Sequence, residues 1–151
     1  MKGARRIGPI AAEDMDALLP MIGDYQRFYL VERIDSERNR AFFSRFIHPS
    51  ADGMLLGAWE DEVLVGYACL YWSFSSLVPA ETVLMNDLYV VEPARGRGIG
   101  RGLIDAAAAA ARERGAHQVE WSTQPGNVTA QRLYDSTGAE RSEWVEYDLP
   151  L

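Results

Sequence analysis

The chain has 151 residues, of which 48% are hydrophobic and 25% charged, which is the composition of a globular protein and not of a disordered or fibrous one. Its formal net charge of −7 argues against general nucleic-acid binding, because such proteins present basic surfaces to phosphates. A chain of this length is most simply one domain, which we expect to span residues 1–151.

The chain has few cysteine and histidine residues. Cys69 is the only cysteine, and His48 and His117 lie far apart, so we predict neither a disulfide framework nor a metal site. Residues 63–80 carry no charge, but their serines and Pro79 favour a buried strand and a loop over a membrane span. Prolines and acidic residues interrupt the N-terminal apolar segment, so it is no signal peptide. We expect a soluble, cytoplasmic protein.

The first half of the chain shows alternating strand and helix patterns. We expect a strand at 4–10, helices at 15–28 and 36–47, and strands at 54–59 and 63–72. Ser36 is the expected N-cap of the second helix. The two strands read as a hairpin through Glu60, Asp61 and Glu62, although this turn lacks the Asn-Gly pair that marks many hairpins.

The next strand, at residues 82–91, is interrupted by two polar residues. Asn86 and Asp87 stand among aliphatic neighbours, and they are costly to bury without hydrogen-bond partners. A β-bulge, or a polar site cut into the sheet, explains such a pair.

Residues 88–104, reading LYVVEPARGRGIGRGLI, organise the chain. An apolar strand stops at Pro93, three glycines alternate with arginines and an isoleucine, and an alanine-rich helix over 98–114 follows. A strand, a glycine-rich turn and a helix start can aim backbone amides at an anion, and arginines add forked donors for phosphate oxygens. The segment therefore predicts the binding of a ligand that carries phosphate.

The remaining elements follow from turn and cap signals. A strand at 117–123 completes a βαβ unit, so it is expected to run parallel to the strand before the glycines. Asn127 is a good N-cap for a helix that ends near Thr137. Residues 139–149 are strand-like, and we expect Trp144, Val145 and Tyr147 to form a closing strand.

Two common glycine motifs do not fit the phosphate site. The dinucleotide fingerprint G-x-G-x-x-G fails because its last position is Arg101 or Leu103. The P-loop needs a lysine, and the only lysine of the chain is Lys2. What remains is the pattern R-x-x-G-x-G over residues 95–100.

This loop, Arg95-Gly96-Arg97-Gly98-Ile99-Gly100, resembles the acetyl-CoA pyrophosphate loop of the GNAT (Gcn5-related) N-acetyltransferases. A second segment about thirty residues downstream, N-x-x-A-x-x-L-Y-x-x-x-G-A over 127–139, resembles the same family. Residues 86–90 look most like its polyamine and histone acetyltransferase-like branch. The resemblance implies an α/β fold, with a mixed twisted sheet of about six or seven strands and helices on both faces.

The resemblance also implies the residues that bind acetyl-CoA. The backbone of 97–101 and the nearby arginines would hold the pyrophosphate, and the strand would bond the pantetheine arm. Asn127 would contact the cofactor, with helix capping alone as its alternative role. The alternative for the loop is a solvated basic turn, and for the strand a plain core strand. The implied set is Leu88, Tyr89, Val90, Arg95, Gly96, Arg97, Gly98, Ile99, Gly100, Arg101 and Asn127.

Three residues are candidates for proton transfer. Tyr134 would protonate the thiolate leaving group, since a phenol with a pKa of about 10 can donate to a developing thiolate; packing on the core is its alternative role. The polyamine branch has an acidic residue where this chain has Asn86, so the general base is open between Asp87, Glu120 and a base acting through water. Asp87 is equally a structural acceptor at a bulge.

The acceptor is expected to be a small amine. An acidic protein favours a small cationic amine, and we pick Tyr29, Trp121 and Asn86 as substrate-binding residues. A protein lysine or N-terminus is the alternative acceptor, and a non-catalytic acetyl-CoA sensor is the alternative function. We expect no nucleic-acid or membrane partner, and a homodimer formed through the C-terminal strand.

Overall fold

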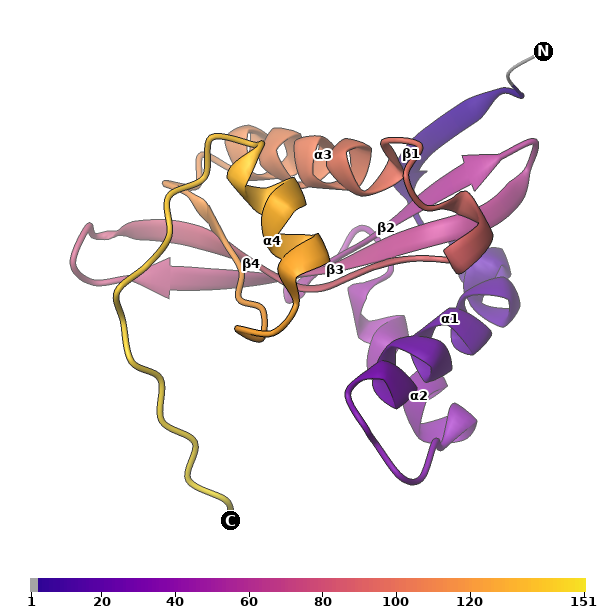
Figure 1. The fold of residues 1–151 in the computed structure, drawn as a ribbon, viewed down its shortest axis with the longest axis horizontal. Coiled ribbons are helices and arrows are strands. Elements are labelled where there is room, and N and C mark those ends of the chain that lie inside the picture. The colour runs from indigo at the N-terminus through magenta and orange to yellow at the C-terminus, as the bar shows by residue number, and fades with distance from the viewer. Residues whose placement is uncertain (1–2) are drawn as a thin grey trace.

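The computed structural model describes residues 3–151, so Lys2 lies outside it. Its centre is one twisted sheet in the order β1-β2-β3-β4-β5 (Figure 1). Neighbouring strands are antiparallel except for β4 and β5, which are parallel as the βαβ pattern predicts. The strands are β1 (Arg5–Pro9), β2 (Gly53–Glu60), β3 (Val63–Ser75), β4 (Ala80–Val90) and β5 (Val119–Glu120).

Helices cover both faces of the sheet, as expected (Figure 1). The pair α1 and α2 lies on one face, whereas α3 and α4 lie on the other. Their bounds are α1 (Met15–Phe28), α2 (Ser36–Phe43), α3 (Ile99–Glu113) and α4 (Val128–Asp135). Within residues 3–151, no helix is both long and apolar enough to cross a bilayer.

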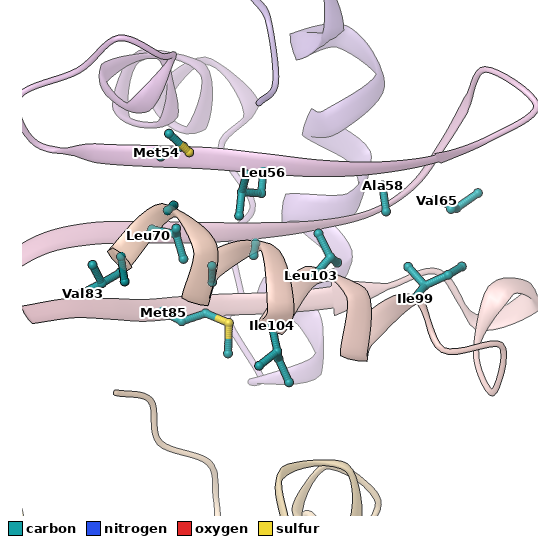
Figure 2. Close-up of a cluster of buried hydrophobic side chains, with 14 of the residues drawn as sticks. Met54, Leu56, Ala58, Val65, Leu70, Val83, Met85, Ile99, Leu103 and Ile104 are labelled. Atoms are coloured by element: carbon teal, nitrogen blue, oxygen red, sulfur yellow. The ribbon is translucent and has the colours of Figure 1, made fainter. Parts of the chain in front are cut away.

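Each face of the sheet has its own hydrophobic core. Under α3, the side chains of Ile99, Leu103 and Ile104 pack on strand residues that include Leu56 and Leu70 (Figure 2). The alanines of α3 bring the helix close to the sheet, because small side chains leave little volume between the two. The opposite core joins α1 and the 3₁₀ turn after α2 to the other side of the same strands. Functional groups on β4 are therefore held by packing on two sides.

The N-terminal elements match the sequence patterns with two corrections, both in the second helix. Asp61 and Glu62 both have positive φ (49° and 63°), so a two-residue turn joins β2 and β3 without an Asn-Gly pair. The second helix is shorter than the expected 36–47, since α2 ends at Phe43 and continues as a 3₁₀ turn. Its N-cap is Asp35 and not Ser36, because the Asp35 carboxylate accepts from the amide of Arg38 (3.0 Å).

The interruption in β4 is a β-bulge. The pairing with β3 shifts by one residue where Cys69 faces Asp87 and Leu70 faces Met85, so Asn86 is the extra residue. The strand expected at 117–123 forms only over Val119–Glu120. It pairs with β4 beside Val83 and Leu84 and then leaves the sheet.

The C-terminal segment corrects the expected strand count. The sheet has five strands in the described chain and not six or seven, and residues 139–151 form no helix or strand. Trp144, Val145 and Tyr147 are largely exposed, with Trp144 at 80% and Tyr147 at 91%. The apolar pattern that predicted a strand is present, but a strand exists only where a neighbour accepts its backbone hydrogen bonds, and the described chain offers none here.

Candidate active site

The loop between β4 and α3 is shaped by two glycines in the left-handed region. Gly96 has φ +76° and Gly98 has φ +82°, conformations that glycine adopts at no steric cost. The first backbone amide of α3 that donates a hydrogen bond within residues 3–151 is that of Gly102. It donates to the carbonyl of Gly98 (3.0 Å). The amides of 97–101 find no acceptor within residues 3–151. They form the kind of donor group that binds phosphate at a helix start.

The three arginines of this loop brace it against neighbouring elements. Arg95 donates through Nε to the carbonyl of Val90 (2.8 Å). Arg97 donates to the carbonyl of Pro93 (3.1 Å) and pairs with the Glu60 carboxylate (3.0 Å). Arg95, Arg97 and Arg101 are all exposed, so their guanidinium groups can turn toward an anion.

Helix α4 is docked against the same loop. A Cβ on Gly100 would lie 3.1 Å from Cδ2 of Leu133, so the glycine lets α4 approach the start of α3. Arg101 pairs with Asp105 (3.1 Å) and donates to the carbonyl of Ser136 (3.3 Å), which ties the end of α4 to α3. The position of α4 is therefore set by its contacts with the glycine loop of residues 95–101, here named the donor loop.

Tyr134 lies on α4 with its ring half-buried. Trp121 packs edge-to-face on that ring, with centroids 5.5 Å apart. Asn127 begins the helix as predicted, because its side-chain oxygen accepts from the amide of Ala130 (3.2 Å). Burial raises the pKa of Tyr134, and the nearby hydroxyl of Tyr29 raises it further. The phenol is thus held in its protonated, hydrogen-bond-donating form.

The β4 edge opposite β3 is open beside this helix. Leu88, Tyr89 and Val90 pair with β3 through Ala68, Tyr67 and Gly66 on one side. On the other side β5 ends its pairing at Leu84, so from Met85 onward no strand of residues 3–151 covers that edge. Backbone groups on an open edge can bond an extended ligand arm.

The bulge holds a buried carboxylate in a network of hydrogen bonds. Asp87 is only 3% exposed. Its two oxygens accept from the hydroxyl of Tyr67 (3.0 Å) and from the side-chain amide of Asn86 (2.6 Å). The hydroxyl of Tyr25, from α1, donates to the backbone carbonyl of Asn86 (3.1 Å). Residues of α1, β3 and β4 therefore converge on one polar centre inside the sheet.

Burial sets the proton affinity of this centre. Loss of water raises the pKa of Asp87, although the hydrogen bonds from Asn86 and Tyr67 lower it in part. Burial and the charge of Asp87 also raise the pKa of the Cys69 thiol, so this cysteine is neutral and a poor nucleophile. The pKa of Tyr25 is raised by burial and then by charge on Asp87, Tyr29 and Tyr134. Tyr25 thus lies within electrostatic reach of both the bulge and α4.

A cavity of about 440 Å³ opens beside the bulge, between α1, α2 and the sheet. Asp87 and Asn86 line it, together with Tyr25 and Tyr71. This volume lies within the usual range of small-molecule sites.

The structure brings some of the expected residues together and separates others. Asn86 and Asp87 line the cavity, whereas Tyr29 and Trp121 do not. Tyr29 packs on Tyr25, with ring centroids 5.0 Å apart, and Trp121 packs on the ring of Tyr134 in α4. Glu120 is exposed on β5, where it accepts from the side-chain amide of Gln118 (2.9 Å).

Several residues of this centre were not predicted. Tyr67 looked like an ordinary core residue, because only the sheet register reveals that its hydroxyl reaches the carboxylate from the neighbouring strand. Arg33 and Arg38 line the cavity from the α1–α2 connection and from α2. They belong to no motif, and exposed arginines are common, so no sequence signal singled them out.

The family of the chain follows from comparison with known proteins. The sequence profile described as "Acetyltransferase (GNAT) family" matches residues 18–139. This range includes both the glycine loop and the Tyr134 segment. The chain therefore belongs to the GNAT family of acetyltransferases, as the two motifs predicted.

Relatives and solved structures agree. The chain is 32% identical to "Uncharacterized N-acetyltransferase YhfO" of Bacillus subtilis over 90% of this chain and 91% of that protein. It is 35% identical to "D-amino-acid N-acetyltransferase HPA3" of Saccharomyces cerevisiae, over 83% of this chain and 78% of the other. A crystal structure of a probable acetyltransferase matches with a TM-score of 0.85 and 33% identity, over 97% of both chains. The protein is an acetyl-CoA-dependent N-acetyltransferase.

Proposed function

We propose that the enzyme transfers acetyl from acetyl-CoA to the primary amine of a small molecule that binds in the cavity beside the β4 bulge. The observation that carries this proposal is the position of Tyr25. Its hydroxyl bonds the bulge backbone, and its pKa responds to charge on both Asp87 and Tyr134. A proton acceptor and a proton donor thus flank one short stretch of β4, next to the donor loop.

The donor side is assigned to the loop and to the open β4 edge. The free amides of 97–101 would bind the pyrophosphate, with Arg95, Arg97 and Arg101 beside it. Leu88, Tyr89 and Val90 would bond the pantetheine arm along the edge that β5 leaves uncovered. This arrangement would aim the thioester between the bulge and Tyr134.

The chemistry is a direct attack. The amine nitrogen forms a bond to the acetyl carbonyl carbon, the carbon–sulfur bond breaks, and its electron pair leaves with sulfur. Tyr134 donates its phenolic proton to that sulfur, and its raised pKa keeps the phenol protonated until the thiolate develops. The nitrogen loses its remaining extra proton as the amide forms, and this proton restores the phenol. The buried, neutral Cys69 argues against a covalent acetyl-cysteine route.

Asp87 is the base that we favour. An alkyl ammonium has a pKa of about 10.4, so the amine must lose a proton before it attacks. The carboxylate of Asp87 lines the cavity, and its raised pKa makes it a stronger base than a free carboxyl. Glu120 is exposed to solvent and outside the cavity lining, so we assign it no proton transfer.

The relatives support a small acceptor. HPA3 is named for D-amino acids, and a bovine relative, 32% identical over 56% of this chain, is named a thialysine N-epsilon-acetyltransferase. The cavity of about 440 Å³ is closed by α1 and α2 on one side, which favours a small molecule over a protein lysine or N-terminus.

The test is a measurement of CoA release with acetyl-CoA and a panel of polyamines, aminoglycosides, amino acids and lysine peptides. We expect turnover with small amines and none above background with peptides. Turnover confined to peptides would favour a protein acetyltransferase. Binding of acetyl-CoA without release on any acceptor would favour a non-catalytic sensor and contradict the proposal.

We also propose that the enzyme works as a homodimer in the cytoplasm. Residues 139–151 are extended, and Trp144, Val145 and Tyr147 expose apolar side chains that a second copy would cover. The exposed β3–β4 hairpin, with Phe74 and Leu77, lies in the same half of the molecule (Figure 1). A reducing compartment suits the free thiol of Cys69.

A further inference from the structure

The acceptor cavity contains two arginines that the proposed chemistry leaves unused. Arg33 lies in the connection between α1 and α2, and Arg38 lies in the first turns of α2. Both side chains line the cavity together with Asp87 and Asn86. Arg33 and Arg38 are exposed, whereas Asp87 is buried.

Neither guanidinium forms an ion pair within residues 3–151. Most arginines of this acidic chain pair with a carboxylate, such as Arg5 with Glu60 and Arg114 with Glu81. Within residues 3–151, the side chains of Arg33 and Arg38 form no such ion pair and donate no hydrogen bond. In a protein with net charge −7, these two arginines place cationic groups in a cavity that also carries the carboxylates of Asp35 and Asp87.

The nearby carboxylate of Asp35 does not cancel this charge by a direct contact. Its oxygen accepts the backbone amide of Arg38 (3.0 Å) and so caps α2. The cavity lining is therefore polarised: the buried Asp87 carboxylate lies at the β4 bulge, and the forked cationic donors Arg33 and Arg38 come from α2 and the segment before it. A ligand that matches both ends carries an ammonium and a carboxylate.

We propose that the acceptor is an amino carboxylic acid, whose carboxylate is bound by Arg33 and Arg38 while its amine faces the β4 bulge. This inference rests on the proposed acetyl transfer and assigns its substrate class. Guanidinium forks match carboxylate geometry bidentately, so the pair selects for the carboxylate and not only for negative charge. A polyamine, which the overall acidity favoured, would bring further positive charge toward two arginines.

The experiment compares amino acids with the amines that lack only the carboxylate. Ornithine is paired with putrescine, lysine with cadaverine, and phenylalanine with phenethylamine, each in both enantiomers where they exist. The measured quantity is the ratio of kcat/KM for the acid to that for its amine, from CoA release. We expect this ratio to exceed ten for at least one pair, since charge-assisted hydrogen bonds discriminate by about that factor.

Variants then test the two arginines. The double substitution Arg33→Gln, Arg38→Gln is expected to lower the ratio about tenfold or more, mainly through KM. Arg33→Glu with Arg38→Glu should invert the preference toward the diamine. Arg112→Gln, at the far end of α3, is the matched control and should keep the wild-type ratio, and thermal melting checks that each variant is folded.

The outcomes separate the inference from the proposed function. No CoA release with any amine would overturn the proposed function itself. Release that proceeds equally with acids and amines, or a ratio unchanged in the double variant, would overturn only the assignment of Arg33 and Arg38. A high ratio that falls in the double variant and holds in the control would support it.

Discussion

Asp87 is a buried carboxylate that lines the proposed acceptor cavity. Tyr67 and Asn86 satisfy its oxygens, which is what allows a charged group to lie inside the sheet at all. The pair Asn86 and Asp87 was visible in the sequence as a polar break in an apolar strand. The register that brings Tyr67 to it was not, because pairing between strands depends on contacts distant in sequence.

Asp87→Asn is expected to remove the acidic limb of the pH–rate profile. Burial raises the pKa of Asp87, so the basic, ionised form is lost as pH falls through a value above that of a free carboxyl, about 3.9. In the wild type, kcat/KM should therefore rise with pH through that raised pKa. Steady-state rates of CoA release across pH check this, together with a large loss of rate in the variant.

Glu120→Gln is the matched control, because this carboxylate is exposed and hydrogen-bonded only to Gln118 in the described chain. It should keep the wild-type pH profile. If Asp87→Asn also kept that profile, a dedicated carboxylate base would be wrong, and a base acting through water would replace it.

The two cavity arginines could not be predicted from the sequence. Arg33 and Arg38 occupy a segment without a motif, and their common role emerges only when α1 and α2 close one cavity over the bulge. Asn127, in contrast, was predicted and observed as a helix cap, because capping depends on residues three apart in sequence.

At the scale of elements, the sequence patterns predicted α3 and α4 well, whereas α2 and β5 are shorter than expected. Helices α3 and α4 lie within one to two residues of their expected bounds, since cap residues mark both ends. The strand β5 is shorter than its apolar pattern, because pairing stops where β4 bulges away and not where the residues change. The shortened β5 is what leaves the β4 edge open for a ligand.

The start of β2 tests whether close packing supports the cavity. A Cβ on Gly53 would lie 1.9 Å from the backbone oxygen of Leu70, and Gly53 pairs with Tyr71, which lines the cavity. Gly53→Ala is expected to force the strands apart and lower the free energy of unfolding by about 1–3 kcal/mol. Urea denaturation followed by circular dichroism measures the change.

Gly8→Ala is the matched control in β1, because a Cβ there meets nothing within 4 Å. Its free energy of unfolding should change by less than about 0.5 kcal/mol. Equal effects in the two variants would show that the close approach of β2 to β3 is not what limits stability at Gly53.

At the scale of the whole molecule, the mixed sheet with helices on both faces was expected from the family resemblance, but the structure of the C-terminal segment was not. The expected closing strand at 139–149 has the right residues and no partner within residues 3–151. Ordering a strand costs conformational entropy, so a segment forms one only where hydrogen bonds and burial offset that cost. A second copy would supply both.

Removal of residues 140–151 is therefore expected to abolish the dimer. Sedimentation or light scattering should give twice the mass of one chain for the intact protein and a single-chain mass for the truncated one. Trp144→Ser, which removes the largest exposed ring of the segment, should weaken the dimer without deleting backbone. A monomeric intact protein at micromolar concentration would contradict the proposed homodimer.

The central claim is that Tyr134 protonates the departing thiolate at a site shared by the donor loop and the β4 bulge. The most direct measurement is kcat for Tyr134→Phe at saturating acetyl-CoA and amine, alongside acetyl-CoA affinity by calorimetry. Because only the phenolic oxygen is lost, packing on Trp121 is retained. The account predicts that kcat falls about 10²-fold or more while acetyl-CoA affinity stays near the wild-type value. Unaltered turnover in the folded variant would contradict it.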